Sequence, residues 1–127
     1  MKLEVIYEDN HLLVVNKPIN IPMQKDSSND EDFLSICKNY LKVKYNKPGN
    51  VYLGLVHRLD RPVGGVMVFA KTSKAASRLS EEVRTNKIHK TYLAVVHGIL
   101  DKKNGKLINK MSKDELMKKA NKLSNFK

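Results

Sequence analysis

The stretch Val51 to Lys71, VYLGLVHRLDRPVGGVMVFAK, decides the fold because two apolar runs flank a short charged loop. Both runs have the composition of buried strands, and the loop between them carries Asp60 among His57, Arg58 and Arg61. Strands on both sides predict a loop that is held rigidly. We therefore expect a candidate site at this loop.

The predicted geometry of the loop follows from the two-residue repeat of a strand. If residues 57–60 are extended, Arg58 and Asp60 project to one side of the chain, and His57 and Leu59 project to the other. Arg58 can then pair with Asp60, and nearby cations favour an ionised carboxylate, which suits nucleophilic or electrostatic chemistry. A surface turn braced by a structural salt bridge is the alternative interpretation.

Further strands and helices are predicted on both sides of this loop. Alternating or continuous apolar residues predict strands at residues 3–7, 11–16, 66–70 and 90–96, the third of them covered on both faces. One helix is expected after a cap at Asn29 or Asp30 and ends before Lys47-Pro48-Gly49-Asn50. A second helix is expected from a cap at Thr72 or Ser73 to about Arg84.

The charge of the chain is strongly asymmetric. Residues 1–60 hold eight Lys or Arg and eight Asp or Glu, whereas residues 61–127 hold sixteen and five, which accounts for the whole net charge of +11. Such asymmetry predicts a polyanionic partner, most simply a nucleic acid, bound through salt-sensitive phosphate contacts. An acidic membrane surface is the competing partner, but no long apolar segment or signal peptide supports it.

The cysteine and histidine content argues against a disulfide and a metal. Cys37 is the lone cysteine, which excludes an internal disulfide and fits a reducing cytoplasm, and its helical spacing with apolar neighbours predicts core packing. The four histidines lack the paired spacing of a zinc site. We expect no metal.

Three segments in register resemble the RluA/RluD-like family of RNA pseudouridine synthases. They are YEDNHLLVVNKP at residues 7–18, HRLDR at 57–61 followed by GGVMVFAKT, and KTYLAVVHG at 90–98. The resemblance spans about residues 3–100 and implies an α+β fold, with flanking helices on a mixed, mostly antiparallel sheet. On this basis residues 1–110 are the amino-terminal part of a catalytic domain, and residues 111–127 are a basic helical or frayed tail.

The resemblance also implies a reaction and its residues. Members of this family isomerise uridine to pseudouridine in RNA, often ribosomal RNA, and need no cofactor. The residue at the position of Asp60 is the family nucleophile, Arg58 matches the arginine beside it, and Tyr92 matches a tyrosine that packs on the target base and takes part in removing a proton. Stacking on an extruded base is physically reasonable because it offsets part of the cost of unstacking.

Several basic residues near these motifs are candidates for RNA contact. They are Lys17, His57, Arg61, Lys71 and Lys90. For Lys17 the loop context alone favours a solvated side chain over one that faces phosphate. Likewise, Lys74, Arg78 and Arg84 on the second helix are expected either to line RNA or to form a solvated polar face.

The chain departs from the family pattern in two places. Val63-Gly64-Gly65 stands where relatives commonly carry Thr-Ser-Gly, so two hydroxyls are absent although the glycine turn is kept. Family domains also continue through further strands after KTYLAVVHG, which implies a missing segment or a partner that completes the sheet. Two alternatives therefore stay open: a non-catalytic RNA-binding remnant, or a basic nucleic-acid module in which Asp60 only braces a loop.

Overall fold

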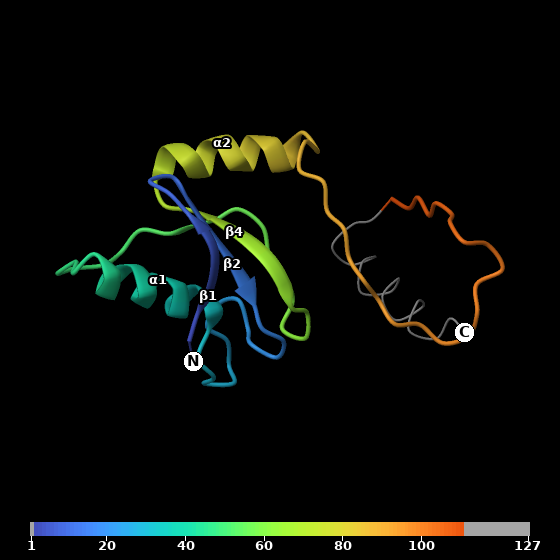
Figure 1. Cartoon of the computed structure of the whole chain (residues 1–127), viewed down its shortest axis with the longest axis horizontal. Coiled ribbons are helices and arrows are strands. Elements are labelled where there is room, and N and C mark those ends of the chain that lie inside the picture. Colours follow the sequence, from blue (N-terminus) through green and yellow to red (C-terminus); the bar gives the residue numbers. More distant parts are fainter. Residues whose placement is uncertain (1, 111–127) are drawn as a thin grey trace. The chain divides into compact units, whose positions relative to one another are not determined.

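The computed structural model describes residues 2–110 and divides into two units, Met1–His89 and Lys90–Lys127, each treated by itself below. Figure 1 shows the elements of the first unit in chain order. They are β1 (Glu4–Glu8), β2 (Leu12–Lys17), α1 (Phe33–Lys44), β3 (Gly54–Leu55), β4 (Gly65–Ala70) and α2 (Ser73–Arg84). The predicted boundary at residue 110 is not tested by this division and stays a prediction.

The strands of the first unit form a sheet of order β1-β2-β4-β3 in which each neighbouring pair is antiparallel. The register of β2 and β4 places Leu13 opposite Phe69 and Val15 opposite Met67, so these four side chains share one face. The predicted α+β fold with a mostly antiparallel sheet and flanking helices is confirmed. In Figure 1 the sheet runs between α1 and α2.

The core forms where α1 covers this face of the sheet. Leu13, Val15, Met67 and Phe69 are fully buried and belong to one cluster with the apolar residues of α1. Those residues of α1 are Phe33, Ile36, Cys37 and Leu41. The Phe33 and Phe69 rings are tilted against each other with centroids 6.2 Å apart. Cys37 packs in the core as predicted, and burial raises the pKa of its thiol to about 12.

Both helices begin at side-chain caps, one of which differs from the prediction. The Thr72 hydroxyl accepts a hydrogen bond from the Ala75 N–H at 3.1 Å, as expected for α2. For α1 the cap is Asp32, whose carboxylate accepts from Ser35 N–H at 3.0 Å, so the predictions of Asn29 and Asp30 were wrong. Helix α1 therefore begins at Phe33, which is fully buried in the core, and not directly after Asn29 or Asp30.

Two strand predictions need correction. Val66 in β4 is 63% exposed, so β4 is not covered on both faces along its length. The second face is covered near Ala70, where α2 approaches closely enough that a Cβ on Gly54 would lie 2.9 Å from the Ala76 Cβ. Within the described part of the second unit, residues 90–96 form no strand, because apolar alternation alone makes a strand only where a neighbouring backbone pairs with it.

The described part of the second unit, residues 90–110, contains neither helix nor strand and is exposed throughout. Its apolar side chains are therefore largely uncovered, with Leu93 and Val95 each 102% exposed. The predicted tail at 111–127 lies outside the described residues. Within residues 2–110, no helix is long and apolar enough to cross a membrane.

Candidate active site

The charged loop between β3 and β4 presents Asp60 at the surface of the first unit. Leu59 is 6% exposed and belongs to the core cluster, whereas the neighbouring Asp60 is exposed, as the two-residue repeat predicts. The Val63 N–H donates to the Asp60 carbonyl at 2.9 Å and closes a tight turn. An anchored Leu59 and a closed turn thus fix the backbone that carries the Asp60 carboxylate.

Lys17 supports this turn from beneath. Its side chain is 1% exposed, and the ammonium donates to the carbonyls of Val63 at 2.8 Å, Arg61 at 3.2 Å and Asp60 at 3.3 Å, and to its neighbour Pro18 at 3.1 Å. The expectation of a solvated Lys17 was wrong, because the last residue of β2 lies on the same face as Leu13 and Val15. Direct contact between this ammonium and RNA phosphate does not fit such burial.

Two opposing effects act on the pKa of the Lys17 ammonium, and their net result is a lowered pKa. Burial lowers the pKa of the Lys17 ammonium, and attraction to the Asp60 carboxylate raises it, with burial the larger effect. The carbonyl oxygens that surround Nζ supply the partial negative charge that a buried ammonium needs. The first unit therefore carries a buried positive charge, the Lys17 ammonium, against the backbone of the turn that presents the Asp60 carboxylate.

Arg58 does not make its predicted pair with Asp60. Its Nη1 donates to the Gln24 Oε1 at 2.5 Å, and the ion pairs and side-chain hydrogen bonds among residues 2–110 do not include the Asp60 carboxylate. Arg58 and Asp60 are both exposed and lie two residues apart on an extended segment. Gln24 replaces Asp60 as the partner of Arg58 because the segment that follows β2 runs beside the turn.

Arg61 ties the same segment to the turn through several acceptors. Its Nε donates to Asn20 Oδ1 at 3.3 Å, its Nη1 lies 3.3 Å from the Ser28 hydroxyl and 3.5 Å from the Asp26 carboxylate, and its Nη2 pairs with Asp30. The predicted RNA contact of Arg61 stays a prediction, and it would require these partners to be exchanged. In the structure Arg61 fixes the position of residues 20–30 against the Asp60 turn.

The remaining candidates lie apart from the turn or support the fold. The half-buried His57 accepts a hydrogen bond at Nε2 from Val68 N–H at 3.1 Å, where the short β3 has ended. The Lys71 ammonium binds the Glu8 carboxylate and the Asp9 carbonyl, each at 2.7 Å.

Two further candidates, Lys90 and Tyr92, belong to the second unit and are described only within it. Tyr92 is 57% exposed. RNA contact by His57, Lys71 and Lys90 and the catalytic role of Tyr92 stay predictions.

Glu8 is the centre of a polar network that sequence reasoning missed. Its carboxylate, 7% exposed, accepts from Lys71 at 2.7 Å, Lys44 at 2.9 Å, Tyr40 at 2.7 Å and Tyr45 at 2.5 Å. Burial opposes its ionisation, but these hydrogen bonds outweigh burial and keep the pKa of Glu8 well below its usual range. The network joins β1, α1 and the residue that follows β4.

Within residues 2–110 there is no group of three or more His, Cys, Asp or Glu side chains placed to hold a metal ion. What the site offers is one exposed carboxylate on a short turn, with a buried ammonium below it and two arginines beside it. Such a turn can present a fixed nucleophile or anion to a substrate at the surface.

The family model of RNA pseudouridylate synthases matches residues 11–126. The chain belongs to this family. Ribosomal large subunit pseudouridine synthase C of Buchnera aphidicola subsp. Acyrthosiphon pisum is 38% identical over 95 residues, which is 75% of this chain and 28% of that protein. A tRNA pseudouridine synthase C of Pectobacterium carotovorum is 36% identical over 124 residues, covering 97% of this chain and 31% of that protein.

A solved structure agrees with these relatives. Human RNA Pseudouridylate Synthase Domain Containing 4 matches 66% of this chain and 30% of its own, with a TM-score of 0.57 and 27% identity. The chain spans roughly three-tenths of the relatives it matches. The family and fold are thus shown, and the turn of Asp60 and the Lys17 below it lie inside the matched region.

Proposed function

We propose that this pseudouridylate synthase family chain isomerises uridine to pseudouridine in RNA, with Asp60 as the nucleophile. The observation that supports it is the exposed Asp60 carboxylate on a turn whose backbone is fixed by Leu59 and Lys17. A fixed carboxylate costs little reorganisation when it meets a reacting atom. The exposure of the carboxylate leaves room for a nucleoside that has been flipped out of its stack.

The reaction is balanced within the nucleoside itself. The Asp60 carboxylate attacks either the ribose or the uracil ring, the bond between ribose and base nitrogen breaks, and the base turns. A carbon–carbon bond then forms between ribose and base, the carboxylate leaves, the base carbon loses its proton, and the ring nitrogen freed from the ribose takes one up. Tyr92 is the proposed stacking partner and proton acceptor. Reactant and product have the same composition, so the step requires no redox cofactor.

Ribosomal RNA is the proposed substrate class. Two of the relatives are ribosomal large subunit synthases, from Buchnera aphidicola and Xanthomonas campestris, and a third is a tRNA synthase. The net charge of +11 fits binding to any RNA backbone and does not choose between these substrates. The proposal also includes further strands, from a missing segment or from a partner, that complete the sheet.

A non-catalytic RNA-binding protein is the second candidate, and a specific observation favours it. Arg58 binds Gln24 instead of Asp60, and Tyr92 lies in a segment that forms no strand. Both features would leave an RNA-binding surface without an assembled catalytic centre. This candidate shares the family and the RNA partner with the first and differs only in turnover.

Release of tritium from RNA labelled at uridine C5 distinguishes the two candidates. An active enzyme releases label, and Asp60→Asn, which keeps the size of the side chain, abolishes release while RNA binding persists. Asp101→Asn, at an exposed residue outside the turn, is the matched control and should release label at the wild-type rate. Binding without any release by the wild-type chain would favour the non-catalytic candidate.

A further inference from the structure

The balanced charge of the first half of the chain conceals a strongly basic segment. Residues 33–59 contain five Lys or Arg and no Asp or Glu, because the acids of residues 1–60 gather before Phe33 and at Asp60. Three of these lysines lie on α1, and the fourth, Lys47, lies three residues after its end. The outer side of α1 therefore has a local charge that the overall composition does not reveal.

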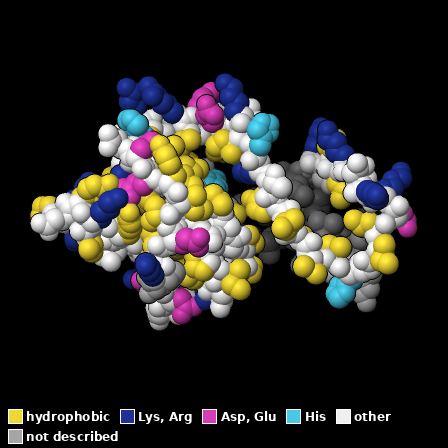
Figure 2. Space-filling model, viewed as in Figure 1, with side chains coloured by type: hydrophobic (Ala, Val, Ile, Leu, Met, Phe, Trp, Pro, Cys, Tyr) yellow, Lys and Arg dark blue, Asp and Glu magenta, His cyan; other side chains and the backbone are white. Residues whose placement is uncertain are grey.

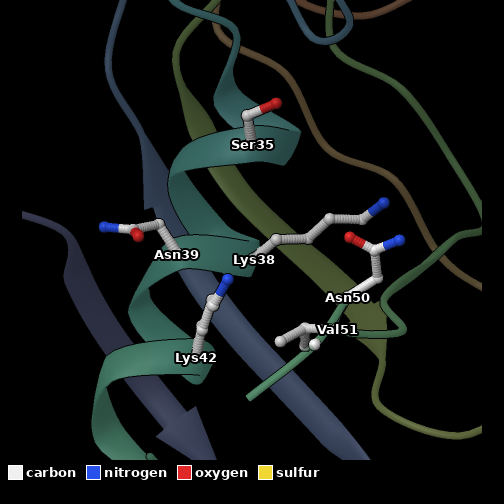
Figure 3. A pocket seen from close by; sticks show the side chains of 7 residues that line it. Ser35, Lys38, Asn39, Lys42, Asn50 and Val51 are labelled. Carbon is white, nitrogen blue, oxygen red and sulfur yellow. The ribbon is translucent and has the colours of Figure 1, made fainter. Parts of the chain in front are cut away.

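A polar hollow of about 470 Å³ lies against this part of the molecule. Figure 3 shows side chains of α1 on one side of the hollow and the segment that follows α1 on the other, with Lys38 extending toward Asn50. Most of the residues that line it have polar side chains, and the full lining is Ser35, Lys38, Asn39, Lys42, Gly49, Asn50 and Val51. Ammonium and amide N–H groups are the donors that phosphate oxygens accept from.

The two lysines that line the hollow, Lys38 and Lys42, carry charge that the described residues do not neutralise. Lys38 and Lys42 are one helical turn apart, a spacing at which like charges repel and destabilise a helix. Neither takes part in an ion pair within residues 2–110, whereas Lys44 on the same helix pairs with Glu8 at 2.9 Å. An anion bound in the hollow would relieve this repulsion.

Helix α2 offers a useful contrast. Its basic side chains lie before and after Glu81 and Glu82, and Arg84 is bonded to Glu81 at 2.6 Å. Figure 2 shows the same mixture, with acidic side chains between the Lys and Arg along the edge formed by α2. The mixed charge of α2 suits solvent, whereas the unmixed charge of α1 suits a polyanion.

We propose that the hollow on α1 is a second RNA contact that binds the phosphate backbone of a single-stranded segment away from the target nucleoside. The proposal rests on the proposed function, since it takes RNA as the ligand. A neighbouring hollow of about 230 Å³ shares Val51 with the first and is lined by Tyr52, which is 50% exposed. An exposed aromatic ring beside lysines is the usual combination for single strands, because bases stack on the ring while phosphates meet the cations.

Binding of a short fluorescent single-stranded RNA of mixed sequence to the full chain, measured across a salt series, tests the site. The slope of log affinity against log salt is negative, and the double variant K38Q/K42Q should make it less steep by about 1.4, the value for two lost phosphate contacts. K38R/K42R, which keeps both charges, should keep the wild-type slope. Tyr52→Leu should weaken binding about fivefold or more and leave the slope unchanged, because it removes stacking and no charge.

The double variant K2Q/K87Q is the control, because it removes the same number of positive charges as K38Q/K42Q. Lys2 and Lys87 are exposed lysines of the same unit that lie outside the basic segment. An equal loss of slope in the control would overturn the inference, because net charge rather than the hollow would then explain the effect. A wild-type slope for K38Q/K42Q, with its helix content intact by circular dichroism, would also overturn it. Full tritium release by Asp60→Asn would instead overturn the role of Asp60 as nucleophile, and it would not affect the proposal that the hollow binds RNA.

Discussion

The Lys17 ammonium donates to the Val63 carbonyl at 2.8 Å, joining the end of β2 to the far side of the Asp60 turn. The two residues are 46 positions apart in sequence. Because the same ammonium also reaches the carbonyls of Asp60 and Arg61, one buried charge binds three carbonyls of the turn. The shape of the candidate site thus depends on a residue that no substrate would touch.

Lys17→Met should unfold more easily and lose activity at the same time. Methionine keeps much of the volume of the side chain but leaves the carbonyls of the turn without a buried donor, which we expect to cost roughly 3 kcal/mol. Urea unfolding followed by circular dichroism measures the stability, and tritium release measures the turnover per folded molecule. Lys25→Met, at an exposed lysine, is the control and should change neither. A fully active, fully stable Lys17→Met chain would contradict the supporting role.

Glu8→Gln should remove a stabilising contribution that depends on pH. The folded pKa of Glu8 lies below its usual value of 4.5, so its contribution is fully present above about pH 4.5 and is lost as the pH falls toward the folded pKa. Unfolding free energies measured from pH 7 to pH 3 should fall for the wild type and fall less for the variant. Glu4→Gln, at an exposed position of the same strand, should follow the wild-type curve.

Much of the first unit could be predicted from local patterns. The strands around Leu13 and Met67 and the helix capped by Thr72 follow from apolar periodicity and capping chemistry, which act over a few residues. The α1 cap was misplaced because Asn29, Asp30 and Asp32 are all good caps, and burial of Phe33 decides among them. Local signals thus predicted the elements better than their boundaries.

The candidate site was harder to predict because its contacts span the chain. Arg58 was expected to pair with Asp60, two residues away, but it binds Gln24, 34 residues away. Lys17 was interpreted as a surface charge, although the two-residue repeat places it on the buried face with Leu13 and Val15. That repeat was the available signal, and it should have outweighed the usual preference of lysine for solvent.

Gly64→Ala should distort the Asp60 turn. A Cβ at this position would lie 3.0 Å from the Lys17 carbonyl oxygen and 3.1 Å from the Ile19 Cγ2, and the backbone oxygen cannot move aside cheaply. We expect a loss of roughly 1–3 kcal/mol in unfolding free energy, with reduced tritium release. Gly49→Ala meets no atom within 4 Å and is the matched control for the unfolding free energy. Equal behaviour of the two variants would show that the close approach at Gly64 is unimportant.

Arg61→Gln should free residues 20–30 from the turn without unfolding the core. The guanidinium contacts Asn20, Ser28, Asp26 and Asp30, and each contact is at least partly exposed, so the effect on global stability should be about 1 kcal/mol or less. Amide hydrogen exchange should become faster in residues 20–31, because local opening no longer breaks these contacts.

Arg84→Gln is the comparison for this last experiment, because it breaks an exposed pair of the same kind, with Glu81, on α2. Exchange in residues 20–31 should stay at the wild-type rate in that variant. If Arg61→Gln leaves exchange in this segment unchanged, the segment is positioned by other contacts, of which the bond from Arg58 to Gln24 is the next to remove. Faster exchange confined to residues 20–31 would instead show that Arg61 couples this segment to the turn that carries Asp60.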